Sequence, residues 1–257
     1  MRFQIHEVPF DADDFEELIA CEVASFDRPQ QSIFRFFYPI FGEEPQEAKD
    51  VAFTNLVELK RQWCRDDPDA LWLKVTDTEH QGKIVGGLLL KIHQTNPFAR
   101  KSSKETSQSA VWYPAGSQRE YIDECTRIFS EPYERYMQRP HPDLYIGFVL
   151  NGYRQAGLAD LLLVAACQRA DELGLEAWTE AVQPTSLVVN MRHGFIPYRK
   201  LPIEPTTETP DDEWLQMERK MQPLRFWPMW RPPSGKIVVG HTMPPWREFM
   251  TGMFSRL

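Results

Sequence analysis

The chain has 257 residues, a formal net charge of −8 at pH 7 and a hydrophobic content of 42%. These values are typical of one globular α/β domain that carries insertions. The acidic balance disfavours nucleic-acid binding, which needs a basic face, and suits a cationic substrate such as an amine. No apolar run reaches the about 18 residues of a membrane span, and residues 1–7 lack the apolar core of a signal peptide, so we expect no membrane partner.

The four cysteines are widely spread and include no C-x-x-C pair. We therefore expect reduced, mostly buried thiols and a cytoplasmic protein. The six histidines include no H-E-x-x-H or comparable spacing, so we expect no metal site. The sequence also lacks the G-x-S-x-G elbow of the α/β-hydrolases.

The first part of the chain alternates strand and helix patterns. Residues 2–8 predict a strand, and the apolar residues of 13–26 and 47–64 recur at helical spacing. Residues 70–76 and 83–92 then predict an antiparallel hairpin. This half of the chain therefore predicts one edge of a sheet with two amphipathic helices.

Residues 93–142 are predicted to be an insertion. Within it, residues 96–109 are polar and rich in Ser and Lys, which predicts a mobile loop. Residues 118–129 predict a helix, and residues 132–137 predict a further helical turn.

The most informative segment is an apolar run that ends in a glycine-containing loop and opens onto a helix. The run covers residues 145–150, and apolar residues at helical spacing from Leu158 to Leu173 predict the helix. This order places unpaired backbone N–H groups at a helix N-terminus, where they can hold a phosphate. We expect Gly157 to permit a close approach of the backbone, and Ala159 to keep the first helical turn small. Neither a P-loop lysine nor a G-x-G-x-x-G fingerprint is present.

The elements after this helix follow in a recognisable order. Residues 176–182 alternate as a half-buried strand does, and Pro184-Thr185-Ser186 starts a second helix. That helix stops at His193-Gly194, and residues 195–198 leave it as a new strand.

The spacing Arg154-x-x-Gly157-x-Ala159 resembles the pyrophosphate loop of the GNAT superfamily of acetyl-CoA-dependent N-acyltransferases. Gly194-Phe195, which closes the second helix, is the other common mark of that family. The resemblance covers roughly residues 143–200 and implies a mixed, mostly antiparallel central sheet flanked by helices, an α/β (α+β) fold with a helical insertion before the fourth strand. Trp112-x-Pro114-x-Gly116-Ser117, together with residues 170–175, resembles a group of fungal GNAT-domain proteins.

The same resemblance implies acetyl-CoA as co-substrate, with backbone amides of the loop on its pyrophosphate and the preceding strand along its pantetheine arm. Three positions depart from the family pattern. Ala156 stands where Arg or Lys is frequent, Gln183 where Asn often contacts the cofactor, and Asn190 where a Tyr often protonates the thiolate. An amide can donate a hydrogen bond to sulfur but is not a general acid. The implied cofactor-binding residues are Phe148, Val149, Leu150, Arg154, Gln155, Ala156, Gly157, Leu158, Ala159, Asp160, Gln183 and Asn190.

Two residues are the candidates for catalysis. Glu180 lies on the strand after the loop helix and is the first candidate for the general base, with a purely solvated or structural carboxylate as the alternative. Asn190 is the second candidate, as a donor to the sulfur. His93, His141, His193 and Glu22 are weaker alternatives for the base, and Tyr145, Trp112 and Trp178 either line an acceptor pocket or belong to the core.

The C-terminal region is rich in proline and aromatic residues. Residues 213–221 predict the last strand, so we divide the chain into one domain at 1–221 and a tail at 222–257 packed on it. Three roles for the tail stay open: a strap across the surface, a lid for the acceptor pocket, and a contact with a second subunit in a homodimer.

Two functions stay open from the sequence. The first is an N-acyltransferase that moves an acetyl group from acetyl-CoA to a primary amine of a small molecule or peptide, by direct attack in a ternary complex. The second is a catalytically weak or inactive protein of the same fold that binds acyl-CoA or a partner, because Asn190 replaces the usual Tyr. The sequence does not identify the acceptor, the acyl chain or the oligomeric state.

Overall fold

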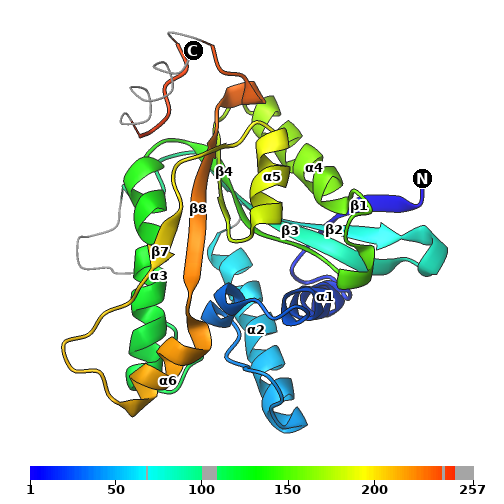
Figure 1. Cartoon of the computed structure of the whole chain (residues 1–257). Coiled ribbons are helices and arrows are strands. Elements are labelled where there is room, and N and C mark those ends of the chain that lie inside the picture. The colour runs from blue at the N-terminus through cyan, green and yellow to red at the C-terminus, as the bar shows by residue number, and fades with distance from the viewer. Residues whose placement is uncertain (68, 100–108, 239–240, 247–257) are drawn as a thin grey trace.

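The computed structural model describes residues 1–67, 69–99, 109–238 and 241–246 (Figure 1). In this part of the chain the strands form a sheet of eight, with the order β1-β2-β3-β4-β5-β8-β6 and with β7 paired to β8. The mixed sheet predicted from the sequence is confirmed. The strands are β1 (Phe3–Val8), β2 (Ala70–Asp77), β3 (Lys83–His93), β4 (His141–Val149), β5 (Ala177–Ala181), β6 (Ile196–Pro197), β7 (Leu201–Ile203) and β8 (Leu224–Arg231).

Strands β1 to β4 form an antiparallel meander, whereas β4 and β5 pair in parallel. The parallel pair is joined by the crossover that contains the glycine loop and its helix. Strand β8 runs antiparallel to β5 and also pairs with β6 and β7. The centre of the sheet is therefore the β3–β4–β5–β8 group, and the crossover returns the chain to it.

Helices cover both faces of the sheet (Figure 1). On one face α1 (Phe15–Asp27) packs on β3 and β4, and α2 (Gln46–Asp66) packs on β2. On the other face α4 (Leu158–Glu172) packs on the same two central strands, with α5 (Pro184–Arg192) beside it. An apolar cluster fills each interface, with Phe15 and Phe148 on the α1 side and Leu88 and Leu162 on the α4 side.

The insertion forms one helix rather than two. Helix α3 (Ser117–Tyr136) runs through Pro132, so the predicted helix and the predicted extra turn are continuous. A proline removes one main-chain hydrogen bond but does not end the helix here. Most of the predicted mobile loop, residues 100–108, lies outside the described residues.

The prediction of a strand at residues 213–221 is wrong. These residues belong to helix α6 (Asp212–Met221), which packs against α3. The carboxylate of Asp211 accepts a hydrogen bond from the Trp214 amide, which is an N-cap, and Trp214, Met217 and Met221 are buried at helical spacing. The capping residue and the helical spacing of the buried residues therefore both favour a helix here.

The last strand is instead β8, which lies in the segment assigned to the tail. Pro228 argues against a strand in the sequence because it has no N–H group to donate. In the sheet its carbonyl accepts from the Tyr198 amide at 2.8 Å, so the proline is tolerated. Further along, Trp246 is buried and packs against Tyr198, Trp178 and Trp230. The domain division at residue 221 stays a prediction, although the residues assigned to the tail include this central strand.

None of the helices in the described residues combines the length and apolar character needed to cross a membrane. The four cysteine thiols are all buried and free.

Candidate active site

Strands β4 and β5 separate shortly after they meet. Their parallel ladder holds only the pairs Asp143–Trp178 and Leu144–Thr179, although β4 continues to Val149. The Thr179 hydroxyl donates to the Leu144 carbonyl at 3.0 Å and closes the paired end. Beyond it β4 stays bonded to β3 on one side, so the side that faced β5 becomes an opening in the sheet. We call this feature the β4–β5 opening, lined by residues 145–149 of β4 and by Glu180 and Ala181 of β5.

A β-bulge accompanies the separation. Leu90 pairs with Leu144 and Leu89 with Ile146, so Tyr145 is an extra residue in β4. Both Tyr145 and Ile146 pack in the cluster on the α1 side. A bulge bends its strand and increases the local twist, which explains why β4 turns away from β5 at this point.

The loop after β4 presents free main-chain donors at the start of α4. A short 3-10 helix, η3 (Asn151–Tyr153), leads into it, and both Gln155 (φ 68°) and Gly157 (φ 80°) are left-handed. Within the described residues, the N–H groups of residue 155 and of residues 157–160 have no hydrogen-bond partner. Such a turn followed by a helix N-terminus forms a concave donor set for an anion. A Cβ at Gly157 would meet nothing within 4 Å, so glycine is needed there for its φ and not for close packing.

The polar side chains of the loop are engaged with the protein. Arg154 donates from Nη2 to the Ser25 carbonyl at 2.6 Å and from Nε to the Val149 carbonyl at 3.4 Å, so it ties the loop to the end of α1. The Asp160 carboxylate binds His193 Nε2 at 2.9 Å and Arg192 Nη2 at 3.2 Å, which fixes the end of α5. Gln155 and Ala156 are exposed. The contribution of the loop to an anion is therefore mainly its backbone.

The two predicted residues of α5 lie in different settings. Gln183 is the exposed N-cap position, and the Ser186 hydroxyl donates to its carbonyl at 2.8 Å. Asn190 is 7% exposed, and its Nδ2 lies 3.6 Å from the Met229 sulfur of β8. The side-chain amide that the sequence assigned to the cofactor sulfur is thus in contact with a sulfur of the protein.

Two buried carboxylates lie at the β4–β5 opening. Glu180 is partly buried and accepts a hydrogen bond from the Trp178 indole of its own strand. Trp178 pairs with Asp143, so both carboxylates project from the sheet face that α4 does not cover. Burial raises the pKa of Asp143 to about 7, and burial together with the negative charge of Asp143 raises the pKa of Glu180 well above its ordinary value. Ionisation of one of these carboxyls therefore disfavours ionisation of the other.

Sequence reasoning found Glu180 but missed Asp143 and its neighbour Lys91. Lys91 pairs with Asp143 across β3 and β4, and its Nζ lies 3.7 Å from the centroid of the Tyr145 ring. Burial lowers the pKa of Lys91. The sequence did contain a signal for Lys91 and Asp143, because a charged residue inside an otherwise apolar central strand costs stability and is therefore often functional.

Another buried polar residue, His141, is the first residue of β4. His141 is fully buried, with Nδ1 at 2.6 Å from the Arg139 carbonyl and Nε2 at 2.9 Å from the Tyr133 hydroxyl. Burial lowers the pKa of His141 to about 4, so the imidazole is neutral and can donate at Nδ1 and accept at Nε2. His93 lies beside it, with ring centroids 5.2 Å apart and ring planes tilted by 55°. Both histidines are accounted for by packing and hydrogen bonds.

The remaining candidates have structural roles. Glu22 binds Lys60 at 2.8 Å, and both side chains are fully buried between α1 and α2. Trp112 donates to the Phe36 carbonyl at 2.8 Å and packs in the cluster around α3 and α6. Tyr145, in contrast, lies at the β4–β5 opening. Among the described residues, no group of His, Cys, Asp or Glu side chains is placed to hold a metal ion.

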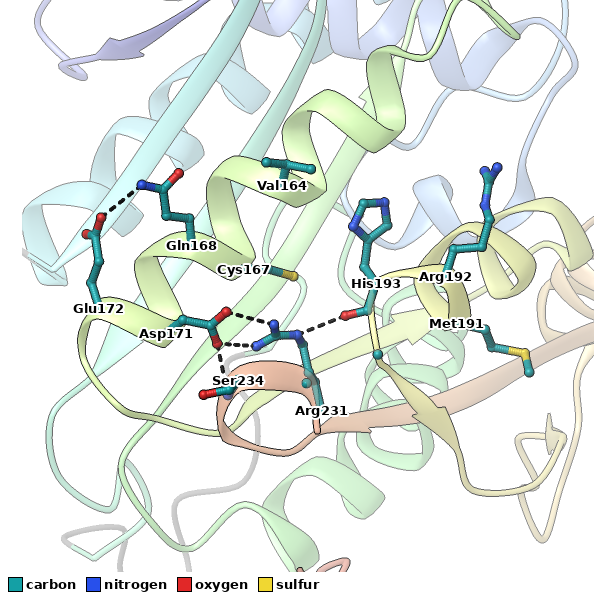
Figure 2. A pocket seen from close by; sticks show the side chains of 12 residues that line it. Val164, Cys167, Gln168, Asp171, Glu172, Met191, Arg192, His193, Arg231 and Ser234 are labelled. Atoms are coloured by element: carbon teal, nitrogen blue, oxygen red, sulfur yellow. Dashed lines mark hydrogen bonds and ion pairs between the residues drawn. The ribbon is translucent and has the colours of Figure 1, made fainter. Parts of the chain in front are cut away.

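Figure 2 shows a surface pocket between α4, α5 and β8, at the opposite end of α4 from the glycine loop. Arg231 binds Asp171 through two nitrogens at 2.6 and 2.9 Å and donates from Nε to the His193 carbonyl at 2.9 Å. The Ser234 amide adds a bond to Asp171 at 3.0 Å. We call these four residues the β8 clamp. Because Arg231 and Asp171 are already paired with each other, we interpret this pocket as a structural contact between β8, α4 and α5.

No protein-family model matches the sequence, and no curated protein matches it in sequence. Solved structures, however, match its fold. Arylalkylamine N-acetyltransferase 2 from Aedes aegypti is 14% identical with a TM-score of 0.58, covering 90% of this chain and 98% of its own. A Drosophila melanogaster polyamine N-acetyltransferase is 14% identical with a TM-score of 0.55, covering 89% and 98%.

A third structure, described as histone acetyltransferase HPA2 and related acetyltransferase from Corynebacterium glutamicum, is 16% identical with a TM-score of 0.52, covering 93% of this chain and 99% of its own. All three likenesses extend over most of the chain. At these identities they show the fold. The chain therefore has the acetyltransferase fold that its resemblance to the GNAT superfamily predicts.

Proposed function

We propose that the protein is an N-acetyltransferase that moves an acetyl group from acetyl-CoA to a primary amine. The observation that carries this proposal is the β4–β5 opening beside a loop with five unpaired amides, with the carboxyls of Asp143 and Glu180 at the same opening. A structure with separated strands but no donor loop, or a loop without the opening, offers no such path for a long thioester. The two similar insect structures are described as acetylating enzymes for arylalkylamines and polyamines, which supports an amine acceptor here.

Acetyl-CoA fits the chemistry of the residues present. The amides of residues 155 and 157–160 are suited to its pyrophosphate, and the free edge of β4 at residues 148–150 to its pantetheine arm. Arg154, Ala156, Gln183 and Asn190 remain proposed neighbours of the cofactor. Main-chain N–H groups of β4 that face the opening can polarise the thioester oxygen.

The carboxylate pair supplies the proton acceptor. An amine must be neutral to attack, so the acceptor ammonium has to lose a proton. The Asp143–Glu180 pair is partly ionised near neutral pH and can accept that proton. A bond then forms between the amine nitrogen and the acetyl carbon while the carbon–sulfur bond breaks. We assign protonation of the leaving thiolate to solvent, because the Asn190 amide is not an acid.

A transfer assay tests the proposal. Purified protein is incubated with acetyl-CoA and a set of polyamines, agmatine and arylalkylamines, and acetylated product and free thiol are measured. We expect equal amounts of both, and their loss in the Asp143→Asn, Glu180→Gln double variant. The exposed carboxylate variant Glu208→Gln is the control. Thiol release without acetylated acceptor would count against amine transfer.

A second function, binding of acyl-CoA without transfer, is favoured by one observation. Asn190 replaces the usual acid and is buried against Met229. Acetyl-CoA binding without product from any acceptor, and no gain of turnover in Asn190→Tyr, would support this alternative. A gain of turnover in that variant would instead show that only the acid is missing.

A further inference from the structure

Lys91 and Asp143 are two opposite charges that face each other without a bond. They are directly opposite in the β3–β4 register, so their side chains share a sheet face. Among the described residues, Lys91 Nζ has no hydrogen-bond or ion-pair partner, and it lies 5.1 Å from the centroid of the Trp63 ring and 3.7 Å from that of Tyr145. Asp143 is 2% exposed, and its Oδ1 is buried without a partner. Both groups lie where the β4–β5 opening begins.

A buried carboxyl with an unpartnered oxygen is costly, and a direct ion pair with the partly exposed Lys91 would relieve Asp143. The aromatic faces of Tyr145 and Trp63 hold the Lys91 ammonium in place instead. Lys60, which pairs with Glu22 at 2.8 Å, also acts on Lys91 and lowers its pKa. Glu180, on β5, adds a second carboxylate on the other side of Asp143. The opening therefore offers a lysine without a hydrogen-bond partner and, beside Glu180, the Asp143 carboxyl with one unpartnered oxygen.

We propose that the acceptor is a zwitterion of the α-amino-acid type, whose carboxylate binds Lys91 and whose amino group lies against Asp143 and Glu180. This inference rests on the proposed acetyl transfer and names its substrate class. A carboxylate on the acceptor gives Lys91 the charge-assisted partner that it lacks. An amine without a carboxylate would place a second cation beside an uncompensated ammonium. Asp67, which follows α2, Cys64 and His93 are further titratable groups that act on Lys91, and none of them is bonded to it.

Matched pairs of acceptors test the inference. Arginine with agmatine, ornithine with putrescine, and tyrosine with tyramine each differ by a single carboxylate. We expect kcat/KM to be higher for the amino acid in at least one pair by roughly 10- to 100-fold, the range of one hydrogen bond to a charged group. Amines preferred in every pair would overturn the inference while leaving acetyl transfer intact.

Variants of Lys91 locate the effect. Lys91→Met should lose the preference for the amino acid over its matching amine by a similar factor, whereas Lys91→Arg should retain the preference. Met is expected to fold, because it replaces an unpartnered ammonium by an apolar chain of similar length. Lys83→Met, an exposed lysine of the same strand, is the control. An unchanged preference in Lys91→Met would overturn the inference.

Binding distinguishes a failed inference from a failed function. Calorimetric titration of tyrosine and tyramine is carried out with free coenzyme A present, so that turnover is not needed. Tighter binding of tyrosine, lost in Lys91→Met, supports the inference even if transfer is slow. Binding of neither ligand, or of tyramine alone, overturns it. The proposed function itself is judged separately, by acetyl-CoA binding and by product formation from any amine.

Discussion

Asp143 illustrates how one residue can cost stability and provide chemistry. Its carboxylate is buried, lacks a partner for one oxygen, and has a pKa of about 7 instead of 3.8. Because the folded state holds the proton more tightly than the unfolded chain, the protonated carboxyl contributes stability at low pH. That contribution is lost as pH rises from 3.8 through about 7. Above this window the ionised form destabilises the fold.

Asp143→Asn is therefore expected to gain stability relative to the natural protein as the pH rises. Between pH 5 and pH 8 the difference in the free energy of unfolding should grow by on the order of 2 kcal/mol in favour of the variant, measured by urea unfolding. At the same time kcat/KM should fall, and the decline of activity below pH 7 should become shallower. A variant that is equally destabilised at both pH values would show that the carboxylate is needed structurally in its ionised form.

Gly157 provides a second residue-scale prediction, with Gly174 as its matched control. Both are left-handed, at φ 80° and 67°, and a Cβ at either position would meet no atom within 4 Å. Gly157→Ala and Gly174→Ala should each lose about 1 kcal/mol of stability in urea unfolding. Only Gly157→Ala should weaken acetyl-CoA binding, because only its amide belongs to the phosphate loop. Equal affinities in the two variants would remove the loop from the site.

At the scale of elements, β8 depends on the β8 clamp. Arg231 is 5% exposed and connects β8 to the end of α4 and to the turn after α5. Arg231→Met leaves the Asp171 carboxylate without its partner and the His193 carbonyl without a donor. We expect a loss of about 2–4 kcal/mol in the free energy of unfolding, against a change within about 0.5 kcal/mol for Arg225→Met, an exposed arginine of the same strand. Equal effects of the two variants would show that the clamp is dispensable.

The elements that the sequence predicts correctly are those with local signals. Helices α4 and α5 have helical periodicity, and glycines end them, so the strand–loop–helix order can be derived directly. Strand β8 was missed because Pro228 suggested irregular structure, and the pairing that accommodates this proline involves the distant Tyr198. For helix α6, the N-cap Asp211 and the helical spacing of Trp214, Met217 and Met221 were local signals that the prediction of a strand did not use.

The candidate site was also predictable only in part, because some of it depends on contacts between segments that are distant in the sequence. The loop amides and Glu180 follow from local order and family resemblance. The relation between Lys91 and Asp143 depends on the β3–β4 register, and the opening depends on the bulge at Tyr145. Neither can be derived from spacing along the chain. The buried contact of Asn190 with Met229 likewise joins two elements that the sequence analysis did not place together.

At the scale of the whole molecule, the fold brings three features to one region of the sheet. The crossover α4 supplies the donor loop, the bulged β4 creates the opening, and β5 adds the second carboxylate. Helices α1 and α2 cover the face from which Lys91 projects (Figure 1). The central claim is that this region binds acetyl-CoA, and every step proposed above requires it.

Thermal unfolding with and without acetyl-CoA tests that claim most directly. At about a hundredfold excess over its dissociation constant, acetyl-CoA should add roughly 2.7 kcal/mol of stability and raise Tm by about 5–10 °C. Free coenzyme A, which carries the same pyrophosphate, should also raise Tm, and Gly157→Ala should reduce both shifts while Gly174→Ala retains them. No shift at millimolar acetyl-CoA would contradict the account, because the opening and the loop would then not form a coenzyme A site.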